Sequence, residues 1–233
     1  YGTDVIEQSE DSVSERYDPL RGEMVIKYGR DFLDKYFPLA GLSWSQITSL
    51  AVKYGKLKVL KGADIFDLKD ENKFIGHRGE SDNPSAIILK NNNLHIEILK
   101  DSRAFAAQQD HAGISDIILE SAVSTICDNE DSVAAVDSED KIICYRNWLG
   151  LMKGDLKSKF EKEGKLFERK LNPHRSYISK DGKGLKLHGR SLLLIRNVGH
   201  LMTNPSILLS DGSEIPEGIM DAFITTAAAL HDI

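Results

Sequence analysis

Three acidic residues and one arginine are the side chains whose types and spacing best suit chemistry. Asp128, Glu130 and Asp131 crowd into a short segment directly after the apolar run that ends at Cys127. Carboxylates this close repel one another, so a cation, a water network or an arginine must offset their charge. Arg196 follows a second apolar run, where a partly buried guanidinium needs an anion from a substrate or from a neighbouring carboxylate. If both runs are strands of one barrel, Glu130 and Arg196 are expected to face the same pocket; a purely structural ion pair at the barrel rim is the alternative.

Other candidate motifs indicate structure rather than chemistry. The acids between 137 and 140 open a helical pattern, where the helix dipole favours negative charge. The seven histidines have no His-x-His or His-Glu-x-x-His spacing, so a histidine metal site is not indicated. Gly182, Gly184 and Gly189 fail the spacing of a dinucleotide-binding loop. The alternating charges of 157–170 are typical of a solvated face.

Strand and helix patterns surround both site candidates. The apolar run at 191–195, Ser-Leu-Leu-Leu-Ile, is typical of a strand buried on both faces of a parallel sheet, and Val-Ser-Thr-Ile-Cys at 123–127 is also expected to be a buried strand. Helical spacing follows each run, at 138–152 and at 216–231. This order favours a barrel or a doubly wound sheet, and barrels place their active sites where the strands end.

The remaining segments predict a separate α+β body. Apolar spacing predicts a helix from 25 to 37, which Pro38 ends. A second helical stripe runs over 114–122. The Asn91–Asn93 run and Asp181-Gly182 favour tight turns between strands. Short stretches with high β propensity predict a small sheet with hairpins, at 57–60, 86–89, 94–98, 176–178 and 185–187.

Composition excludes several classes of protein. The chain has 233 residues, 28% of them charged, and a formal net charge of -6 with a pI near 5.7, which argues against a nucleic-acid partner. Cys127 and Cys144 have no Cys-x-x-Cys spacing, which favours a reducing compartment. The sequence shows no run of the roughly 18 apolar residues that a membrane-spanning helix needs and no signal-peptide pattern, so we expect a soluble, cytoplasmic protein without a membrane partner. Because the chain begins without Met and stops just after an apolar helical stretch, we expect a fragment.

Long strings of this sequence resemble malate synthase of the G isoform. The longest are Asn-Glu-Asp-Ser-Val-Ala-Ala-Val-Asp at 129–137, Tyr-Arg-Asn-Trp-Leu-Gly-Leu-Met at 145–152 and Gly-Arg-Ser-Leu-Leu-Leu-Ile-Arg-Asn-Val-Gly-His-Leu-Met at 189–202. Shorter matches occur at 1–4, 17–19, 91–97, 169–172 and 215–219. The resemblance extends over essentially the whole chain.

The resemblance implies an α/β fold, namely part of a (β/α)8 TIM barrel with an inserted α/β domain, within an internal fragment of a longer enzyme. Together with the segment pattern it predicts five parts. They are a barrel strand end and loop at 1–18, the first part of the inserted domain at 19–122, a barrel strand–helix unit at 123–154, the second part of the inserted domain at 155–190, and a barrel strand–helix unit at 191–233.

The resemblance also implies a reaction. The family condenses acetyl-CoA with glyoxylate in a Claisen-type, Mg2+-dependent step of the glyoxylate cycle, and hydrolysis of the thioester gives malate and CoA. Magnesium acts as a Lewis acid on the glyoxylate carbonyl. The full-length enzyme is expected to be a monomeric, cytoplasmic acyltransferase.

Roles carried over from the family fall on five residues. Arg196 is implied to be the catalytic arginine that binds glyoxylate, and Ser132 and Arg169 to bind acetyl-CoA. Glu130 and Asp131 are implied to hold magnesium-bound waters as a second shell. The direct magnesium ligands and the catalytic Asp are expected downstream of this sequence, so the chain alone is not expected to catalyse the reaction.

Two other functions remain open at this point. The chain could be a non-catalytic α/β interaction module. It could also belong to another divalent-metal barrel lyase or aldolase that uses Glu130 and Asp131 as direct ligands.

Overall fold

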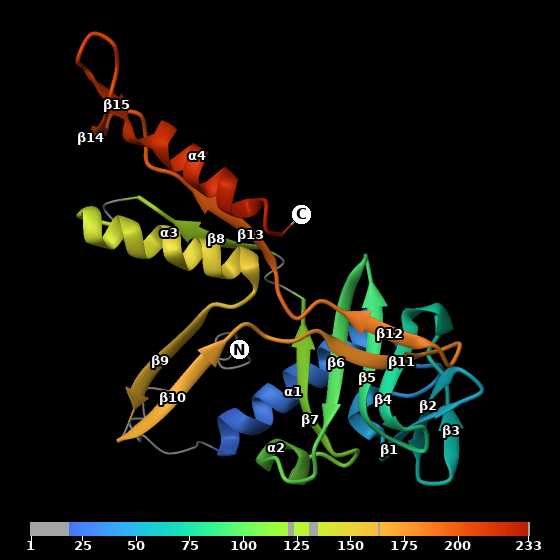
Figure 1. Cartoon of the computed structure of the whole chain (residues 1–233). Coiled ribbons are helices and arrows are strands. Elements are labelled where there is room, and N and C mark those ends of the chain that lie inside the picture. The colour runs from blue at the N-terminus through green and yellow to red at the C-terminus, as the bar shows by residue number, and fades with distance from the viewer. Residues whose placement is uncertain (1–18, 121–123, 131–134, 163, 233) are drawn as a thin grey trace. The chain divides into compact units, whose positions relative to one another are not determined.

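The computed structural model describes residues 19–120, 124–130, 135–162 and 164–232, which group into two compact units (Figure 1). Unit 1 takes in Tyr1–Ser121 and Arg175–Leu187, and unit 2 takes in Ala122–His174 and His188–Ile233. Helices and sheets occur in both units, so the predicted mixed α/β class is confirmed. No closed barrel forms among the described residues. None of the described helices is long and apolar enough to cross a membrane.

A six-stranded antiparallel sheet organises unit 1. Its order is β12-β11-β4-β5-β6-β7. The bounds are β4 Phe74–Glu80, β5 Asn83–Asn91, β6 Leu94–Lys100, β7 Ile114–Leu119, β11 Arg175–Ser179 and β12 Gly184–Leu187. Strands β11 and β12 join this sheet from far along the chain, through the pairs Ile178↔His77 and Ser179↔Gly76.

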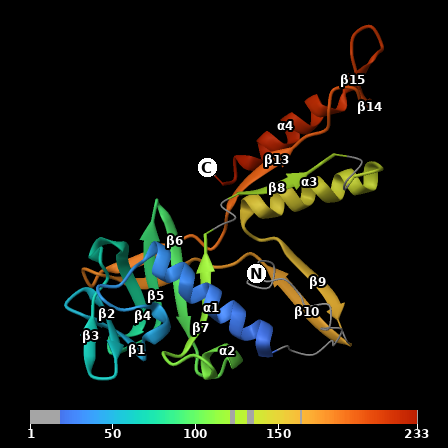
Figure 2. The same cartoon turned by 180° about the vertical axis from the view of Figure 1, so that it is seen from behind.

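Both faces of this sheet are covered. The helix α1 (Pro19–Tyr36) lies across one face (Figure 2). Leu33 of α1 and Phe37, the residue directly after the helix, are fully buried in one apolar cluster with Ile87 and Ile98 of the sheet. The β11–β12 hairpin pairs with β4 only at Ile178 and Ser179, and it lies over the opposite face of the neighbouring strands in Figure 1. Tyr177 packs there in a second cluster with Ala86 and Ile88 of β5 and with Leu187. The helix predicted from 25 to 37 is confirmed as α1.

A three-stranded sheet and a short helix complete unit 1. Strands β1 (Ser49–Lys53), β2 (Lys56–Lys61) and β3 (Asp64–Phe66) pair in that order, and α2 spans Phe105–Gln108. Two-residue turns join β1 to β2 and β5 to β6, at Tyr54-Gly55 and Asn92-Asn93, and all four of these residues have positive φ. Such turns match the twist of paired strands and favour Asn and Gly. The turn expected at Asn91–Asn93 is thus confirmed.

The helix expected over 114–122 is wrong where the structure describes this segment. Ile114–Leu119 forms β7, which pairs with β6 through Ile96↔Leu119 to Lys100↔Ile114. A short apolar run fits the period of either element, and its three isoleucines favour a strand. The edge of β6 offers backbone hydrogen-bond partners to a neighbouring strand. Pairing with this edge decides that the segment forms a strand and not a helix.

Two parallel strands and two helices form the centre of unit 2. Strand β8 (Ser124–Asp128) pairs with β13 (Leu192–Arg196) in parallel register, from Leu192↔Ser124 to Arg196↔Asp128. Helix α3 (Ser138–Lys153) follows β8, and helix α4 (Glu217–Ala229) comes after β13. Trp148 and Met152 of α3 pack with Ala228 of α4 in the apolar cluster of this unit. The strand, loop, helix order expected at 123–152 is confirmed. After β13, where only a loop was expected, the strands β14 (Thr203–Leu208) and β15 (Glu214–Pro216) come before α4.

The burial expected for these two strands is wrong within this chain. Ile126 is 63% exposed and Leu192 is 66% exposed. A sheet of two strands has no inner strand, and α3 and α4 cover only part of its apolar surface among the described residues. The apolar runs therefore indicated the strands and their parallel pairing correctly, but not their exposure.

Capping residues fix the ends of α3. The side chain of Asp137 accepts a hydrogen bond from the Asp140 amide at 2.9 Å, and Gly154 ends the helix with φ 75°. Side-chain caps at the first turn and a left-handed glycine after the last turn are common helix boundaries. The capping function expected for the acids at 137–140 is confirmed.

Two hairpins extend unit 2. Strand β9 (Lys157–Lys162) pairs with β10 (Lys165–Lys170), and β14 (Thr203–Leu208) pairs with β15 (Glu214–Pro216). The segment 155–190, expected to be the second part of an inserted domain, is divided between the units, because only β11 and β12 group with unit 1. The five-part domain division stays a prediction.

Candidate functional site

Arg196 and Asp128 face each other at the carboxyl ends of the two parallel strands. The register pairs these two residues directly. The Arg196 Nε donates a hydrogen bond to Asp128 Oδ1 at 2.8 Å, and Nη2 donates to Oδ2 at 2.6 Å. This bidentate geometry fixes the plane of the guanidinium as well as its charge. Parallel pairing therefore brings together an acid and a cation that lie far apart in the sequence.

The ion pair shifts the pKa values of both Asp128 and Arg196. The Arg196 guanidinium lowers the pKa of Asp128, because it donates a hydrogen bond to the ionised carboxylate. Asp128 in turn raises the pKa of Arg196, and the negative charge of Glu130 adds to this effect. Arg196 therefore carries a fixed positive charge at the strand ends, with two acids near it.

Arg196 is more accessible than the sequence analysis expected. Its side chain is 53% exposed, whereas that of Asp128 is 22% exposed. The expectation of a partly buried guanidinium is therefore wrong, for the same reason that the strands themselves are exposed. Its direct partner is Asp128 rather than Glu130, whose own amide donates to Asp128 Oδ1 at 3.0 Å. An exposed guanidinium held by one carboxylate keeps a side open to an anionic ligand.

Two of the predicted site residues lie outside the described residues. Asp131 and Ser132 fall in the gap between 130 and 135, so their predicted roles stay predictions. Glu130 is half-buried beside the Arg196 pair.

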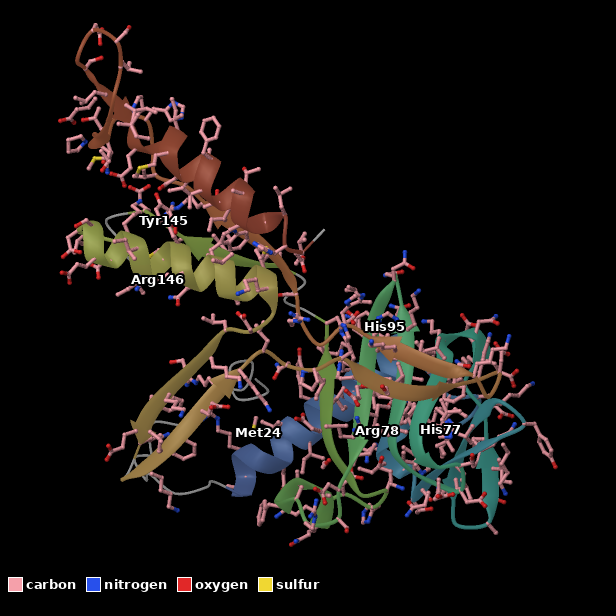
Figure 3. The ribbon with its side chains drawn as sticks, in the orientation of Figure 1. Met24, His77, Arg78, His95, Tyr145 and Arg146 are labelled. Atoms are coloured by element: carbon pink, nitrogen blue, oxygen red, sulfur yellow. The ribbon has the colours of Figure 1, made fainter. Side chains whose placement is uncertain are left out.

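Two charged residues behind the strand ends were missed by the sequence analysis. Lys141 of α3 and Asp221 of α4 are 6% and 0% exposed, and they form an ion pair. Tyr145, labelled on α3 in Figure 3, donates a hydrogen bond to the other oxygen of Asp221. Charges at the inward positions of two apolar helices are unusual, because burial of an unpaired charge is costly. Charged residues at inward positions of these helices were therefore a sequence signal that could have indicated the Lys141–Asp221 pair.

The described residues do not form a metal site. No group of three or more His, Cys, Asp or Glu side chains that could hold a metal ion occurs within the described ranges. Asp128 is engaged with Arg196, which leaves Glu130 as the nearest acid. Mg2+ favours several oxygen ligands in octahedral geometry. These residues by themselves do not fit a magnesium ion as direct ligands.

Arg169 lies on a basic hairpin. Its guanidinium lies 4.5 Å from the ring centroid of Phe160 on the paired strand, and Phe160 stacks on Phe167. The described strands β9 and β10 carry more basic than acidic side chains, and all residues of β10 are exposed. The basic ones are Lys157, Lys159, Lys162, Lys165, Arg169 and Lys170. A cation held over an aromatic ring, among other cations, suits contact with a phosphate group.

Comparisons with known proteins agree with this picture of a segment. Residues 17–91 match the malate synthase G alpha-beta insertion domain. Over its full length the chain is 48% identical to malate synthase G of Halalkalibacterium halodurans, 49% identical to that of Corynebacterium efficiens and 47% identical to that of Corynebacterium glutamicum. The chain spans 32%, 31% and 32% of these relatives, or about a third of each.

Proposed function

We propose that this chain, which belongs to the malate synthase G family, supplies part of the active site for condensation of acetyl-CoA with glyoxylate to give malate and CoA. The observation that carries the proposal is the Arg196–Asp128 pair at the carboxyl ends of two parallel strands, each of which leads on to a helix. In a TIM barrel this edge of the sheet holds the active site. The proposal includes the barrel, of which β8–α3 and β13–α4 would be two units.

Arg196 supplies a fixed positive charge to the reaction. Removal of a proton from the acetyl methyl group builds negative charge on the thioester oxygen, and glyoxylate itself is an anion. A cation that is already oriented stabilises such charge without the cost of reorganising at the moment of reaction. Asp128 holds Arg196 in one orientation, and the exposed side of the guanidinium is where glyoxylate would bind.

Acetyl-CoA is the second substrate of the proposal. Arg169, on its basic hairpin, would contact a phosphate of CoA, and Phe160 would keep the guanidinium in place. Ser132 stays in the proposal as an acetyl-CoA contact that lies outside the described residues.

Magnesium enters the proposal only as the ion of the complete enzyme. Glu130 and Asp131 would hold its waters, and the direct ligands would come from parts of the enzyme that this sequence does not contain. The ion would polarise the glyoxylate carbonyl as a Lewis acid. The cytoplasmic location and the monomeric state also stay predictions.

The test measures thiol release from acetyl-CoA with and without glyoxylate. It uses a full-length malate synthase G in which this sequence occupies the matching third, and the 233-residue chain is assayed beside it. We expect glyoxylate-dependent release from the full-length enzyme and none from the chain alone. Release that does not require glyoxylate, or activity of the chain by itself, would contradict the proposal.

Two substitutions assign the roles within the full-length enzyme. Arg196→Ala removes the fixed cation and is expected to abolish condensation, whereas Arg146→Ala removes an exposed arginine of α3 and serves as its matched control. Arg169→Ala is expected to raise the acetyl-CoA KM, with Arg103→Ala as the control, because Arg103 is an exposed arginine that pairs with Asp101 away from this hairpin. Full turnover after Arg196→Ala, or an unchanged KM after Arg169→Ala, would remove the residue from its proposed role.

A further inference from the structure

A buried ion pair connects the two helices of unit 2. The Lys141 Nζ lies 3.3 Å from Asp221 Oδ2 and 2.7 Å from Glu217 Oε1. The side chains of Lys141 and Asp221 are 8% and 0% exposed. Burial by itself would lower the pKa of Lys141, but the carboxylates of Glu217 and Asp221 outweigh burial and raise that pKa. Lys141 is therefore charged at neutral pH, and its charge is balanced inside the unit.

The same pair binds the backbone just beyond both parallel strands. The Lys141 Nζ donates a hydrogen bond to the Asn129 carbonyl oxygen at 3.1 Å. The Asp221 Oδ2 accepts a hydrogen bond from the Val198 amide at 2.9 Å. Asn129 lies between Asp128 and Glu130 in the sequence, and Val198 follows Arg196 by two positions. One ion pair thus contacts both loops that carry the candidate site residues.

Further bonds leave these loops little freedom. The Asn129 amide donates to the Arg196 carbonyl at 2.9 Å, which continues the contact between the strands past the last register pair. Tyr145 donates a hydrogen bond to Asp221 Oδ1 and the Val198 amide donates to Oδ2, so both carboxylate oxygens have donors. A Cβ at Gly218 would lie 2.3 Å from the Val198 carbonyl oxygen, so the start of α4 lies directly against the loop after β13.

Stability alone gives no strong reason for this arrangement. Apolar side chains of similar volume often hold two helices together as well as a buried ion pair does. Apolar side chains cannot, however, bind a peptide carbonyl on one loop and a peptide amide on another. Lys141 and Asp221 do both, at residues adjacent to the site.

We propose that Lys141 and Asp221 are positioning residues, which hold the Asn129 and Val198 backbones and thereby set the placement of Glu130 relative to Arg196. The inference rests on the proposed condensation reaction for its kinetic consequence. Misplacement of reacting groups by about 1 Å can cost on the order of 100-fold in rate. Acetyl-CoA binding through Arg169 on β10 does not depend on these bonds.

The experiment uses the full-length enzyme described above and three variants of the pair. Lys141→Met removes the donor to Asn129 and leaves Asp221 without its buried cation. Asp221→Asn keeps an acceptor for Val198. The double variant Lys141→Met/Asp221→Asn removes both charges of the pair but still leaves the Asn129 carbonyl without a donor. Lys153→Met is the matched control, because Lys153 pairs with Asp155 on the exposed surface near the end of the same helix.

We expect Lys141→Met to lower kcat by about 10- to 100-fold and to change the acetyl-CoA KM by a smaller factor, because Arg169 on β10 is not held by these bonds. The double variant should regain part of the Tm lost by Lys141→Met, because Asp221 no longer carries an unpaired charge, although Glu217, whose side chain is 15% exposed, still lacks Lys141. Its kcat should stay low. Asp221→Asn is expected to retain more activity than the double variant. Recovery of kcat together with Tm in the double variant would overturn the proposal, because the pair would then be merely structural.

Amide hydrogen exchange separates this inference from the proposed reaction. Peptides covering 124–130 and 192–198 should exchange faster in Lys141→Met than in Lys153→Met, under conditions where both proteins are folded. If the unsubstituted enzyme fails to condense acetyl-CoA with glyoxylate, the proposed function is wrong, while the exchange result still decides whether the pair holds the loops. Unchanged exchange in Lys141→Met would overturn the positioning role whatever the activity.

Discussion

The buried carboxylate of Glu97 in unit 1 leads to a quantitative prediction. Glu97 of β6 lies beneath the β11–β12 hairpin and its side chain is 4% exposed. Arg175 Nη1 donates to Glu97 Oε2 at 2.8 Å, and Arg78 Nη2 lies 3.4 Å from Oε1. The two arginine side chains are 29% and 43% exposed, and Arg78 is labelled in Figure 3. Of these three charged side chains, only the carboxylate is cut off from water.

Because the carboxylate is buried and the arginines are not, removing Arg175 should cost more unfolding free energy than neutralising Glu97. Arg175→Met leaves the longer Arg78 contact as the remaining ion pair of the buried carboxylate. Loss of one partner of a buried pair costs about 3–5 kcal/mol, and because Arg78 remains we expect a loss of about 2–3 kcal/mol in the free energy of unfolding. Glu97→Gln keeps a hydrogen-bond acceptor and leaves two guanidinium groups that reach water, so we expect a loss of about 1 kcal/mol. The double variant should lie between the two single ones.

The assay must report on unit 1 alone, because two units need not unfold together. Trp44 is fully buried in unit 1 and Trp148 is buried in unit 2. Urea unfolding of the 233-residue chain is therefore followed by Trp44 fluorescence in a Trp148→Phe background. Arg103→Met is the control, because Arg103 pairs with Asp101 on the surface and should have no measurable effect. A Glu97→Gln loss equal to or greater than the Arg175→Met loss would refute the reasoning.

Three further predictions concern titration, packing and reactivity. Burial and the Glu97 carboxylate raise the pKa of Tyr177 from 10.0 to about 12, so its contribution to stability is present below pH 10 and is lost as the pH rises towards 12. Tyr177→Phe should flatten this loss of stability in unfolding monitored by Trp44 fluorescence. A pH profile unaltered by Tyr177→Phe would count against the prediction. Gly218→Ala should destabilise unit 2 by about 1–3 kcal/mol, because the new methyl group would clash with the Val198 carbonyl oxygen. Unfolding monitored by Trp148 fluorescence measures the loss, and an unchanged midpoint would contradict the contact. Burial raises the pKa of both cysteine thiols, so iodoacetamide should react slowly with the folded chain and faster in urea; equal rates in both states would disprove the prediction.

Much of the local structure could be predicted because the signals are local. Pro38 ends the region of α1, Asp137 caps α3, and Asn92-Asn93 turns between β5 and β6. The segment that forms β7 could not be predicted in this way. Its apolar spacing fits a helix, and the decisive partner is the edge of β6, which no local pattern reveals.

The candidate site could be predicted only in part. The apolar runs indicated the two parallel strands and placed Arg196 at the end of one of them. Which acid pairs with Arg196 depends on strand register, and a shift of one residue would change the partner from Asp128. Lys141 and Asp221 were missed because a buried ion pair forms between residues of two helices whose contact the sequence does not state.

The late return of the chain to the first sheet has a consequence for biosynthesis. Strand β4 pairs with β11 through His77 and Gly76, so its outer edge stays without that partner until the ribosome has released residues up to Leu187. A nascent chain that has emerged only as far as α3 therefore carries an open strand edge and leaves Glu97 without Arg175. Such edges invite pairing with other chains. Synthesis that stalls within this interval should yield aggregation-prone intermediates, whereas a circularly permuted gene that encodes the hairpin before β4 should not.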